Sequence, residues 1–520
     1  NMKALPLVVA LTCALMVGPA LAQAPPIRWQ RSLGGSNIEQ GNAVRQTSDG
    51  GFLVAGETSS NNGDISENHG SVDCWVIQLD PEGTMLWQRA YGGSNEERAN
   101  DIRTTSDGGS VFVGSTISTD GDVTGLHGTS NDVWVVKLDA NGALEWQRTL
   151  GGSGLDIGHA IVQLSDGGYV IAASSRSDDG DLSTHNGALT QYDAWLIRLD
   201  TVGNIVWQRT YGGTSDETIN ALEPLGNGGF ILAGESSSSD GDVSGAHGQI
   251  DAWVFEVDAD GNLLWQRALG GTLIDRALAI HQLPVGGFIV AGESSSNNGD
   301  VYAGHGMLDA WVVNIDAMGA VLWQRALGGS VNDMANAVEL TSDGGSLIAG
   351  FTYSNNGNVA GGHGGADAWL LKLNGEGTML WQKAMGGTAD DKALNMIVNA
   401  EGGSVIVGRS SSNNGDVTAN AGFADVWVVR LDGFVGIDEF HGSPLSVSPN
   451  PSRGLLRVVD PTMANGVSTI VLSDLSGRRL IERRWGSTDQ VLDLGEQPSG
   501  VYVLSLFAEG VVWNARLVLE

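Results

Sequence analysis

The sequence predicts an all-β fold, because tryptophan, glycine and turn signals recur along most of the chain. Fourteen of the sixteen Trp in this 520-residue chain fall on a sevenfold repeat with a period of 58 to 61 residues. Seven of them open a Trp-Gln-Arg/Lys tripeptide: Trp29, Trp87, Trp146, Trp207, Trp265, Trp323 and Trp381. Seven more lie two residues after an Asp: Trp75, Trp134, Trp195, Trp253, Trp311, Trp369 and Trp427. The 76 Gly suit short strands joined by tight turns. Such a period is typical of modular arrays whose units bury their apolar faces against one another.

Each repeat has the pattern of four short strands, as the second repeat illustrates. We expect strands over residues 100–103 and 110–116, joined by a Ser-Asp-Gly-Gly turn in which Gly supplies positive φ. A long polar loop then leads to an expected strand over 132–139, and an Ala-Asn-Gly turn leads to the last strand, over 143–150. Four antiparallel strands repeated seven times predict a seven-bladed β-propeller.

The ends of the array predict how the propeller closes. The last repeat stops after Leu431-Asp432 without a fourth strand, whereas Trp29-Gln30-Arg31 precedes the first complete repeat. We therefore expect residues 27–33 to supply the missing strand, which removes two exposed sheet edges.

This region resembles the bacterial seven-bladed β-propeller repeat family. The resemblance is carried by Gly-Gly-Phe-Ile-Val-Ala-Gly at 286–292, Asp-Ala-Trp-Val-Val at 309–313 and Leu-Trp-Gln-Arg-Ala-Leu-Gly-Gly at 322–329, and it covers about residues 27–433. It implies the fold and a surface or secreted setting, and it implies no activity.

Charge and apolar segments narrow the setting further. A net charge of −33 argues against nucleic acid as a partner, because phosphates need Lys and Arg. Residues 1–22 are predicted to be a secretory signal peptide that ends in an Ala-Leu-Ala cleavage site, so the mature propeller would occupy 23–433. No later apolar run is long enough to cross a bilayer. Cys74 would be the only cysteine of the mature chain, which predicts no internal disulfide.

The long loops are all predicted to lie on one rim of the propeller. The loop between the second and third strands and the connection between repeats open on the same rim, so we expect the binding surface there. We also expect this rim to be acidic, because a carboxylate stands ten residues after each Trp-Gln tryptophan. These carboxylates are Glu39, Glu97, Asp156, Glu217, Asp275, Asp333 and Asp391. They could accept backbone N–H bonds or pair with the Arg or Lys two residues after that tryptophan. The Asp before each second Trp, such as Asp73, is predicted to be a structural acceptor.

An Asx-Gly-Asx element in the long loop is the candidate metal site. Ca²⁺ prefers six to eight oxygen ligands, and closely spaced Asp side chains around a Gly offer several. The candidate calcium ligands are Asp64, Asp120, Asp122, Asp179, Asp181, Asp240, Asp242, Asp300 and Asp416. Plain Asx turns are the alternative.

Five repeats add a His to the same loop: His69, His127, His247, His305 and His363. These side chains could be bonded to backbone, or they could form a pH-sensitive loop.

No catalytic signature emerges from the sequence. The chain lacks a Gly-x-Ser-x-Gly elbow, a zinc helix and a phosphate loop. An enzyme would need a pocket built by repeats that depart from the pattern, and a glycosidase would need two suitably spaced carboxylates. The third repeat departs most, through Arg176, His185, Gln191 and Tyr192.

The composition changes after a linker at residues 434–444. Residues 445–520 lose the repeat, gain arginine and show apolar strands, which predicts a small Ig-like β-sandwich. Three ordered motifs there resemble the type A C-terminal sorting domain of the type IX secretion system. The residues that carry the resemblance are Pro449, Asn450, Pro451, Gly454, Asp474, Gly477, Arg478, Gly500 and Tyr502. The resemblance implies export through the periplasm, translocation across the outer membrane and removal of the tail by a sortase. An Ig-like carbohydrate-binding module is the alternative.

Taken together, the sequence predicts an exported binding or scaffold protein, secreted or held at the cell surface, whose acidic loop-rich rim binds a surface glycan or a protein. A secreted hydrolase or lyase acting on polysaccharide and a structural surface-layer component are the two alternatives.

Overall fold

The computed structural model describes residues 24–182, 184–399 and 402–433, and then 446–448, 452, 454–459, 468–474, 479–485, 489–495, 497–498, 500–508 and 511–519. Every regular element in these residues is a β-strand, which confirms the all-β prediction. The chain divides into two units, Asn1–Phe434 and Val435–Glu520. The predicted signal peptide at 1–22 and linker at 434–444 lie outside the described residues. No helix long and apolar enough to cross a membrane occurs in the part of the chain that is described.

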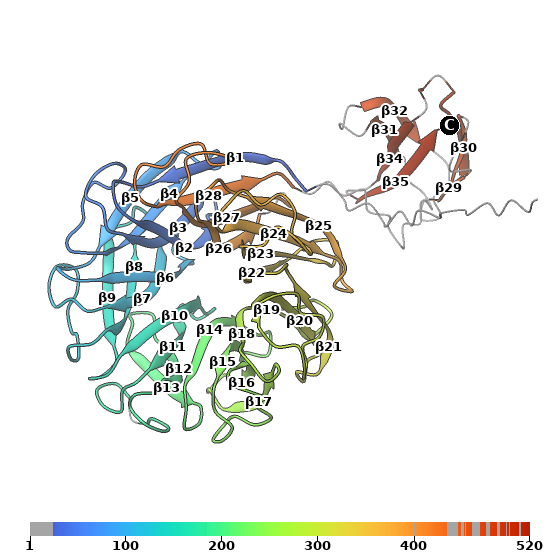
Figure 1. The fold of residues 1–520 in the computed structure, drawn as a ribbon. Coiled ribbons are helices and arrows are strands. Elements are labelled where there is room, and N and C mark those ends of the chain that lie inside the picture. Colours follow the sequence, from blue (N-terminus) through green and yellow to red (C-terminus); the bar gives the residue numbers. More distant parts are fainter. Residues whose placement is uncertain are drawn as a thin grey trace, which may run out of the picture. The chain divides into compact units, whose positions relative to one another are not determined.

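The described part of the first unit contains seven antiparallel four-stranded sheets that follow one another around a common centre (Figure 1). Sheet 1 contains β2 (Glu39–Gln46), β3 (Phe52–Thr58), β4 (Asp73–Leu79) and β5 (Met85–Tyr91). Sheet 2 contains β6 (Glu97–Thr104), β7 (Ser110–Thr116), β8 (Asp132–Leu138) and β9 (Leu144–Leu150). Sheet 3 contains β10 (Asp156–Gln163), β11 (Tyr169–Ser175), β12 (Asp193–Leu199) and β13 (Ile205–Tyr211).

The remaining four sheets have the same organisation. Sheet 4 contains β14 (Glu217–Pro224), β15 (Phe230–Ser236), β16 (Asp251–Val257) and β17 (Leu263–Leu269). Sheet 5 contains β18 (Asp275–Gln282), β19 (Phe288–Ser294), β20 (Asp309–Ile315) and β21 (Val321–Leu327). Sheet 6 contains β22 (Asp333–Leu340), β23 (Ser346–Thr352), β24 (Asp367–Leu373) and β25 (Met379–Met385). Sheet 7 contains β26 (Asp391–Val398), β27 (Ser404–Ser410), β28 (Asp425–Leu431) and β1 (Ile27–Leu33).

Sheet 7 joins the two ends of the array, as the sequence predicts. Strand β1 pairs antiparallel with β28, with Leu33 opposite Val426 and Ile27 opposite Leu431. Strand β2 of sheet 1 in turn contacts β26, β27 and β28, the three other strands of sheet 7. The junction between sheets 7 and 1 thus repeats the contacts that other neighbouring sheets make.

The two recurring tryptophans have different structural roles. The Trp that follows Asp is buried in every sheet, and its Nε1 donates to the Gln of the Trp-Gln pair at 2.7 to 3.0 Å. In sheet 7 this bond joins Trp427 to Gln30, which are far apart in the sequence.

The Trp of the Trp-Gln pair instead reaches the neighbouring sheet. Trp29 covers Gly83 in the β4–β5 turn so closely that a Cβ on that Gly would lie 2.9 Å from the indole ring. Arg31 donates through Nε to the Gly83 carbonyl oxygen at 2.8 Å and through Nη2 to that of Glu82 at 2.8 Å. The tripeptide that recurs in each repeat therefore packs one sheet against the next.

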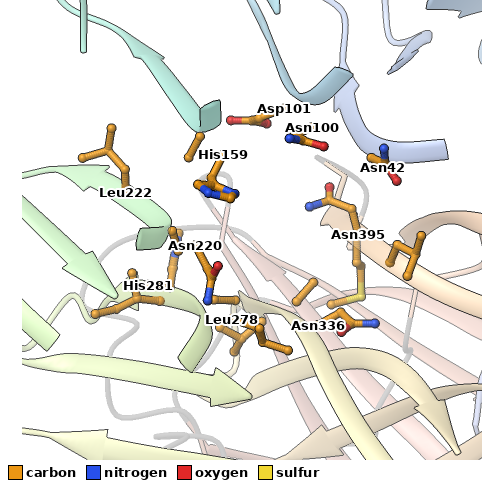
Figure 2. Close-up of a pocket in the computed structure, with 18 of the residues that line it drawn as sticks. Asn42, Asn100, Asp101, His159, Asn220, Leu222, Leu278, His281, Asn336 and Asn395 are labelled. Carbon is orange, nitrogen blue, oxygen red and sulfur yellow. The ribbon is translucent and has the colours of Figure 1, made fainter. Parts of the chain in front are cut away.

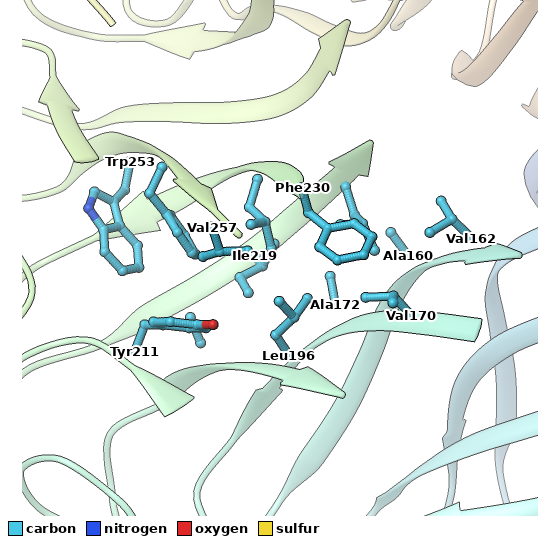
Figure 3. Packing of buried hydrophobic residues seen from close by; sticks show 14 of the residues in the cluster. Ala160, Val162, Val170, Ala172, Leu196, Tyr211, Ile219, Phe230, Trp253 and Val257 are labelled. Carbon is cyan, nitrogen blue, oxygen red and sulfur yellow. The ribbon is translucent and has the colours of Figure 1, made fainter. Parts of the chain in front are cut away.

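Apolar side chains of neighbouring sheets form shared cores. Between sheets 3 and 4, for example, Val170 and Leu196 lie in one cluster with Ile219, Phe230 and Trp253 (Figure 3). Each sheet is thus buried on both faces by its neighbours, which is the arrangement expected of a modular array.

A β-bulge recurs in the innermost strand of all seven sheets. In sheet 1, Gly41 pairs with Gly56 and Ala43 with Ala55, so Asn42 is the extra residue. A Cβ on Gly56 would lie 1.8 Å from the carbonyl oxygen of Gln40, so the bulge requires a residue without a side chain there. A bulge locally re-aims side chains, and here it acts on the fourth residue of each inner strand.

The second unit contains two sheets with a common core. One consists of β29 (Ser446–Ser448), β30 (Leu455–Val459) and β33 (Asp489–Asp493), and the other of β31 (Ser468–Asp474), β32 (Arg479–Trp485), β34 (Gly500–Ala508) and β35 (Val511–Leu519). Leu456 and Leu492 of the first sheet share an apolar cluster with Leu472 and Leu504 of the second. Of the motif residues, Gly454, Asp474, Gly500 and Tyr502 belong to the described residues. Those outside them are Pro449, Asn450, Pro451, Gly477 and Arg478.

Candidate functional site

The seven carboxylates predicted to make the loop-rich rim acidic are buried instead. Each is the first residue of an inner strand, and each side chain is fully enclosed. All seven accept a backbone N–H bond at 2.7 to 2.9 Å from the second Gly of the preceding Gly-Gly pair. In sheet 2, Glu97 also accepts a bond from Thr116 Oγ1 at 2.8 Å. These carboxylates hold the loop to the sheet. No described ion pair joins them to the Arg or Lys of the tripeptide. In three sheets that guanidinium donates instead to the next sheet's turn, from Arg31, Arg148 and Arg325.

The Asx-Gly-Asx candidates for calcium also have backbone partners. The first Asx accepts an N–H bond at 2.7 to 2.9 Å from the residue after the Gly-Gly pair. The second accepts an N–H bond from the first Gly of that pair at 3.0 to 3.2 Å. The two Asp of one element, such as Asp120 and Asp122, therefore serve different amides. Among the described residues, no group of three or more His, Cys, Asp or Glu side chains is placed to hold a metal ion. Calcium binding stays a prediction.

Three of the five loop histidines lie between carboxylates of adjacent sheets. In sheet 2, His127 Nδ1 is 2.8 Å from Asp132 Oδ2, and its Nε2 is 3.7 Å from Asp181 Oδ2 in sheet 3. The His247–Asp300 and His363–Asp416 pairs repeat this approach, each at 3.9 Å. The backbone N–H of each of these three His also donates to the Asp that begins the third strand of its own sheet. The predicted acceptor role of that Asp is confirmed.

The unusual residues of the third repeat pack on one another. Arg176 lies over the Tyr192 ring, 3.8 Å from its centroid, and the His185 Nε2 and the Gln191 carbonyl oxygen are 3.1 Å apart. The His185 side chain is only 2% exposed. None of these four side chains lines the pocket described next.

A pocket of about 260 Å³ lies instead where the inner strands of the seven sheets converge (Figure 2). It is lined by the fourth to seventh residues of these strands, so it occupies the half of the inner strands that leads to the tight turns. We call it the axial pocket. The binding surface that the sequence predicts at the opposite, loop-rich rim stays a prediction; hollows occur there too, one lined by His127 and Asp181 and another by His247 and Asp300.

The bulge residues form the first ring of the axial pocket. Four of the seven are Asn, and each donates through Nδ2 to a backbone carbonyl of the next inner strand at 2.8 or 2.9 Å. The four are Asn42, Asn100, Asn220 and Asn336. His159, Leu278 and Leu394 occupy the other three places. Burial lowers the pKa of His159 to about 4, so that imidazole is neutral at ordinary pH.

The seventh residues of the inner strands form a second ring, which carries charge. In sheets 1 and 2 these residues are Arg45 and Arg103, with Asp101 between them. Arg45 Nη2 donates to Asp101 Oδ1 at 2.7 Å, and Arg103 Nε donates to Asp101 Oδ2 at 3.2 Å. Burial, and then the charge of Arg103, lower the pKa of Arg45 to about 10. Asp101 thus offsets part of the charge of two adjacent arginines.

Sheets 4, 5 and 6 contribute Glu223, His281 and Glu339 to the same ring. His281 Nδ1 bonds to Glu223 Oε1, and Glu223 Oε2 accepts the Gln282 N–H at 2.9 Å. Burial lowers the pKa of His281, but the hydrogen bond and charge of Glu223 outweigh it and raise the pKa overall. Burial also raises the pKa of Glu339, against the opposing charges of His281 and Arg45. Cationic groups from two sheets therefore face anionic groups from others across one small space.

Sequence reasoning missed this charged ring. The signal was present, because the seventh position of the inner strand is Arg, Arg, Val, Glu, His, Glu and Ile from sheet 1 to sheet 7. It is the most variable inward position of an otherwise regular repeat, and its members converge only once the sheets are arranged around a centre.

Comparisons with known proteins add little on function. No family model matches the chain. The Regulatory protein FlaEY of Caulobacter vibrioides is 28% identical over an alignment 265 residues long, which covers 46% of this chain and 27% of that protein. The chain thus spans about a quarter of the length of this relative.

Similarity to solved structures is low. The WD40 domain of Neurospora crassa Pan2 is 10% identical with a TM-score of 0.42, over 78% of this chain and 95% of that one. Puromycin hydrolase is 13% identical with a TM-score of 0.45, over 84% of this chain and 62% of that one. Values this low carry no argument about activity.

Proposed function

We propose that this chain is an exported, seven-bladed β-propeller that binds a small polar molecule in its axial pocket. One observation carries the proposal. The pocket gathers the charged residues by which the repeats differ, whereas the residues common to all repeats hold the sheets together. A residue that recurs in every sheet stabilises the repeat itself. A residue type that occurs in only some of the sheets is available to bind a ligand.

The seven-bladed form is supported by the strand pairing. Seven four-stranded sheets occur in the described residues, and β1 completes the last of them by pairing with β28. Closure of this kind leaves no unpaired strand at the junction.

A binding role is favoured over the two alternatives. A structural surface-layer component would have no need of six charged side chains in an inner pocket. A polysaccharide hydrolase or lyase would need an open cleft for the sugar chain. The axial pocket, at about 260 Å³, is smaller than most sites for drug-sized ligands.

Export is proposed from the two ends of the sequence. The predicted signal peptide would direct the chain to the periplasm, and the motifs of the tail would present it to the type IX secretion machinery and its sortase. The described tail residues are compatible with this proposal. Tyr502 Oη donates to the Pro498 carbonyl oxygen at 2.6 Å, which connects two residues of the last motif.

Binding is tested by a thermal-unfolding screen of small polar molecules against the full chain and an Ala279→Phe variant. Ala279 lines the pocket, so the new ring would fill it. A ligand at 100 times its Kd should stabilise the native chain by about 2.7 kcal/mol. Ala279 also packs against an apolar cluster, so the variant should unfold cooperatively at its own, lower temperature and lose the ligand-dependent shift. Equal shifts in both proteins, or no shift with any molecule, would contradict binding in this pocket.

Export is tested by fusing residues 445–520 to a periplasmic reporter in a bacterium that has a type IX system. The fusion should reach the surface or medium with its tail removed, and Gly477→Trp should retain it in the periplasm. Retention of the unaltered fusion would contradict the sorting role.

A further inference from the structure

Two charged groups of the axial pocket have bonding capacity that the protein does not use. The first is Arg103, whose Nε donates to Asp101 and to the Ile161 carbonyl oxygen. Within the described residues, no acceptor bonds to its two terminal nitrogens. Its side chain is 32% exposed, so these nitrogens can be reached from the pocket.

The second group is Glu339 in sheet 6. Its carboxylate makes no hydrogen bond and no ion pair with any described residue, although it lies among the lining residues. Nearby Arg45 and His281 act on it only through space, and Glu223 repels it. A half-buried carboxylate without a donor is costly unless a ligand or water supplies one.

The other charged groups of the pocket already have partners. Arg45 donates to the Val44 carbonyl oxygen, Asn395 Oδ1 and Asp101 Oδ1 at 2.6, 3.1 and 2.7 Å. Glu223 and His281 are bonded to each other. Among the described groups, Arg103 keeps both terminal nitrogens free and Glu339 its whole carboxylate, whereas His281 keeps only Nε2.

We propose that the axial pocket binds a small zwitterion, with its carboxylate on Arg103 and its ammonium group on Glu339. This inference is based on the proposed function and specifies its ligand class. The planar guanidinium fork matches a carboxylate in a bidentate geometry. A carboxylate such as that of Glu339 accepts the N–H bonds of an ammonium group, and complementary charges at two places fix the ligand's orientation.

The dimensions limit the ligand to the size of a free amino acid or a very short peptide. About 260 Å³ lies below the roughly 300 Å³ at which pockets for drug-sized ligands begin. Arg103 and Glu339 do not pair with each other, and they belong to sheets 2 and 6. Both line the same pocket, and the charge of Arg103 acts on Glu339 across it, so a ligand with two separate charges has an opposite charge available for each.

The test is calorimetric titration of the full chain with free amino acids and dipeptides. Each binder is then compared with its N-acetyl derivative, which lacks the ammonium charge, and its amide, which lacks the carboxylate. We expect at least one zwitterion to bind and both derivatives to bind at least tenfold more weakly. Binding of amino acids but not dipeptides, or the reverse, identifies which of the two is the ligand.

Variants assign the two contacts. Arg103→Val and Glu339→Ile introduce the residues that sheets 3 and 7 already carry at this position, Val162 and Ile397, so the fold should accept them. Arg103→Val should weaken binding of the zwitterion at least tenfold and barely change binding of its amide, which lacks the carboxylate. Glu339→Ile should weaken binding of the zwitterion equally and barely change binding of its N-acetyl derivative, which lacks the ammonium charge. Glu339→Gln keeps the shape as a second variant, and Glu376→Gln, in an exposed turn, is the matched control.

The outcomes separate this inference from the proposed function. Suppose that a neutral or singly charged molecule binds, that Ala279→Phe blocks its binding, and that no zwitterion binds. This result would overturn the proposed ligand class and leave the proposed binding function intact. Zwitterion binding unaffected by both Arg103→Val and Glu339→Ile would also overturn it. Absence of any ligand in the unfolding screen would overturn both.

Discussion

At the scale of single residues, the recurring carboxylates hold the loop of each repeat to its own sheet. Glu97 accepts bonds from Gly93 N and Thr116 Oγ1, both inside a fully buried site. The sequence predicts a role for this carboxylate and leaves two kinds of partner open. Spacing could not decide between them, because the Arg of the tripeptide is on the outermost strand and reaches the next sheet.

Removing one such carboxylate should destabilise the protein substantially. We expect Glu97→Ala to lower the free energy of unfolding by about 2–3 kcal/mol, because a buried N–H and a hydroxyl lose their acceptor. Urea unfolding measures this loss. Glu96→Ala changes the exposed neighbouring Glu and should cost less than about 0.5 kcal/mol. Equal effects of the two variants would contradict the structural role of Glu97.

Asp425 gives a pH-dependent prediction. Burial, and then the charges of Glu39 and Asp64, raise its pKa to about 6, whereas the value in an unfolded chain is about 4. The folded state thus binds this proton more tightly, so the stabilising effect is complete below about pH 4 and is lost as the pH rises through about 6.

Asp425→Asn should therefore stabilise the protein at pH 8 by about 1–2 kcal/mol and give little or no gain at pH 4. The amide keeps the acceptor for the Ala421 N–H. Chemical unfolding at both pH values measures the difference, with Asp260→Asn in an exposed turn as control. A gain that does not depend on pH would contradict the raised pKa.

At the scale of elements, the bulged inner strand connects fold to site. The bulge positions Asn42 and its counterparts to donate to the next sheet, and the residues three further along form the charged ring. Sequence patterns predicted most strands closely, including β7 at 110–116. They placed the start of β6 at residue 100 rather than 97, because Glu97 and Arg98 resemble loop residues when burial is unknown.

Gly114 tests the bulge directly. A Cβ there would lie 1.7 Å from the Arg98 carbonyl oxygen, so Gly114→Ala must displace backbone. We expect a loss of about 3 kcal/mol or more in unfolding free energy. Ligand binding should weaken too, because Asn100 and Arg103 follow the displaced Arg98 on β6. The matched control is Gly226→Ala, whose Cβ would meet nothing within 4 Å. A Gly114→Ala protein as stable as this control would contradict the account of the bulge.

At the scale of the whole molecule, the sevenfold period predicts the ring but not the pocket. The ring follows from recurring packing residues such as Trp427, which any single repeat reveals. The pocket depends on which residues from different repeats meet, and three sheets lie between those of Arg103 and Glu339 in the sequence. No local sequence pattern relates these two residues, and the long loops predict binding at the opposite rim.

Closure by β1 should be as strong as any other part of the ring. Trp427 bonds to Gln30 at 2.8 Å as Trp75 bonds to Gln88 at 2.7 Å. Gln30→Ala and Gln88→Ala should each cost about 1–3 kcal/mol, because each leaves a buried indole N–H without its acceptor. Thermal and urea unfolding compare the two variants. A much smaller cost for Gln30→Ala would indicate that β1 is loosely held and that the ring is open.

The most direct test of the central claim, that the axial pocket is the binding site, is a crystal structure of the full chain with its bound ligand. The account predicts ligand density among Arg103, His281 and Glu339, with the long loops unchanged. Density on the loop-rich rim, over the Asx-Gly-Asx elements and with the axial pocket empty, would contradict it.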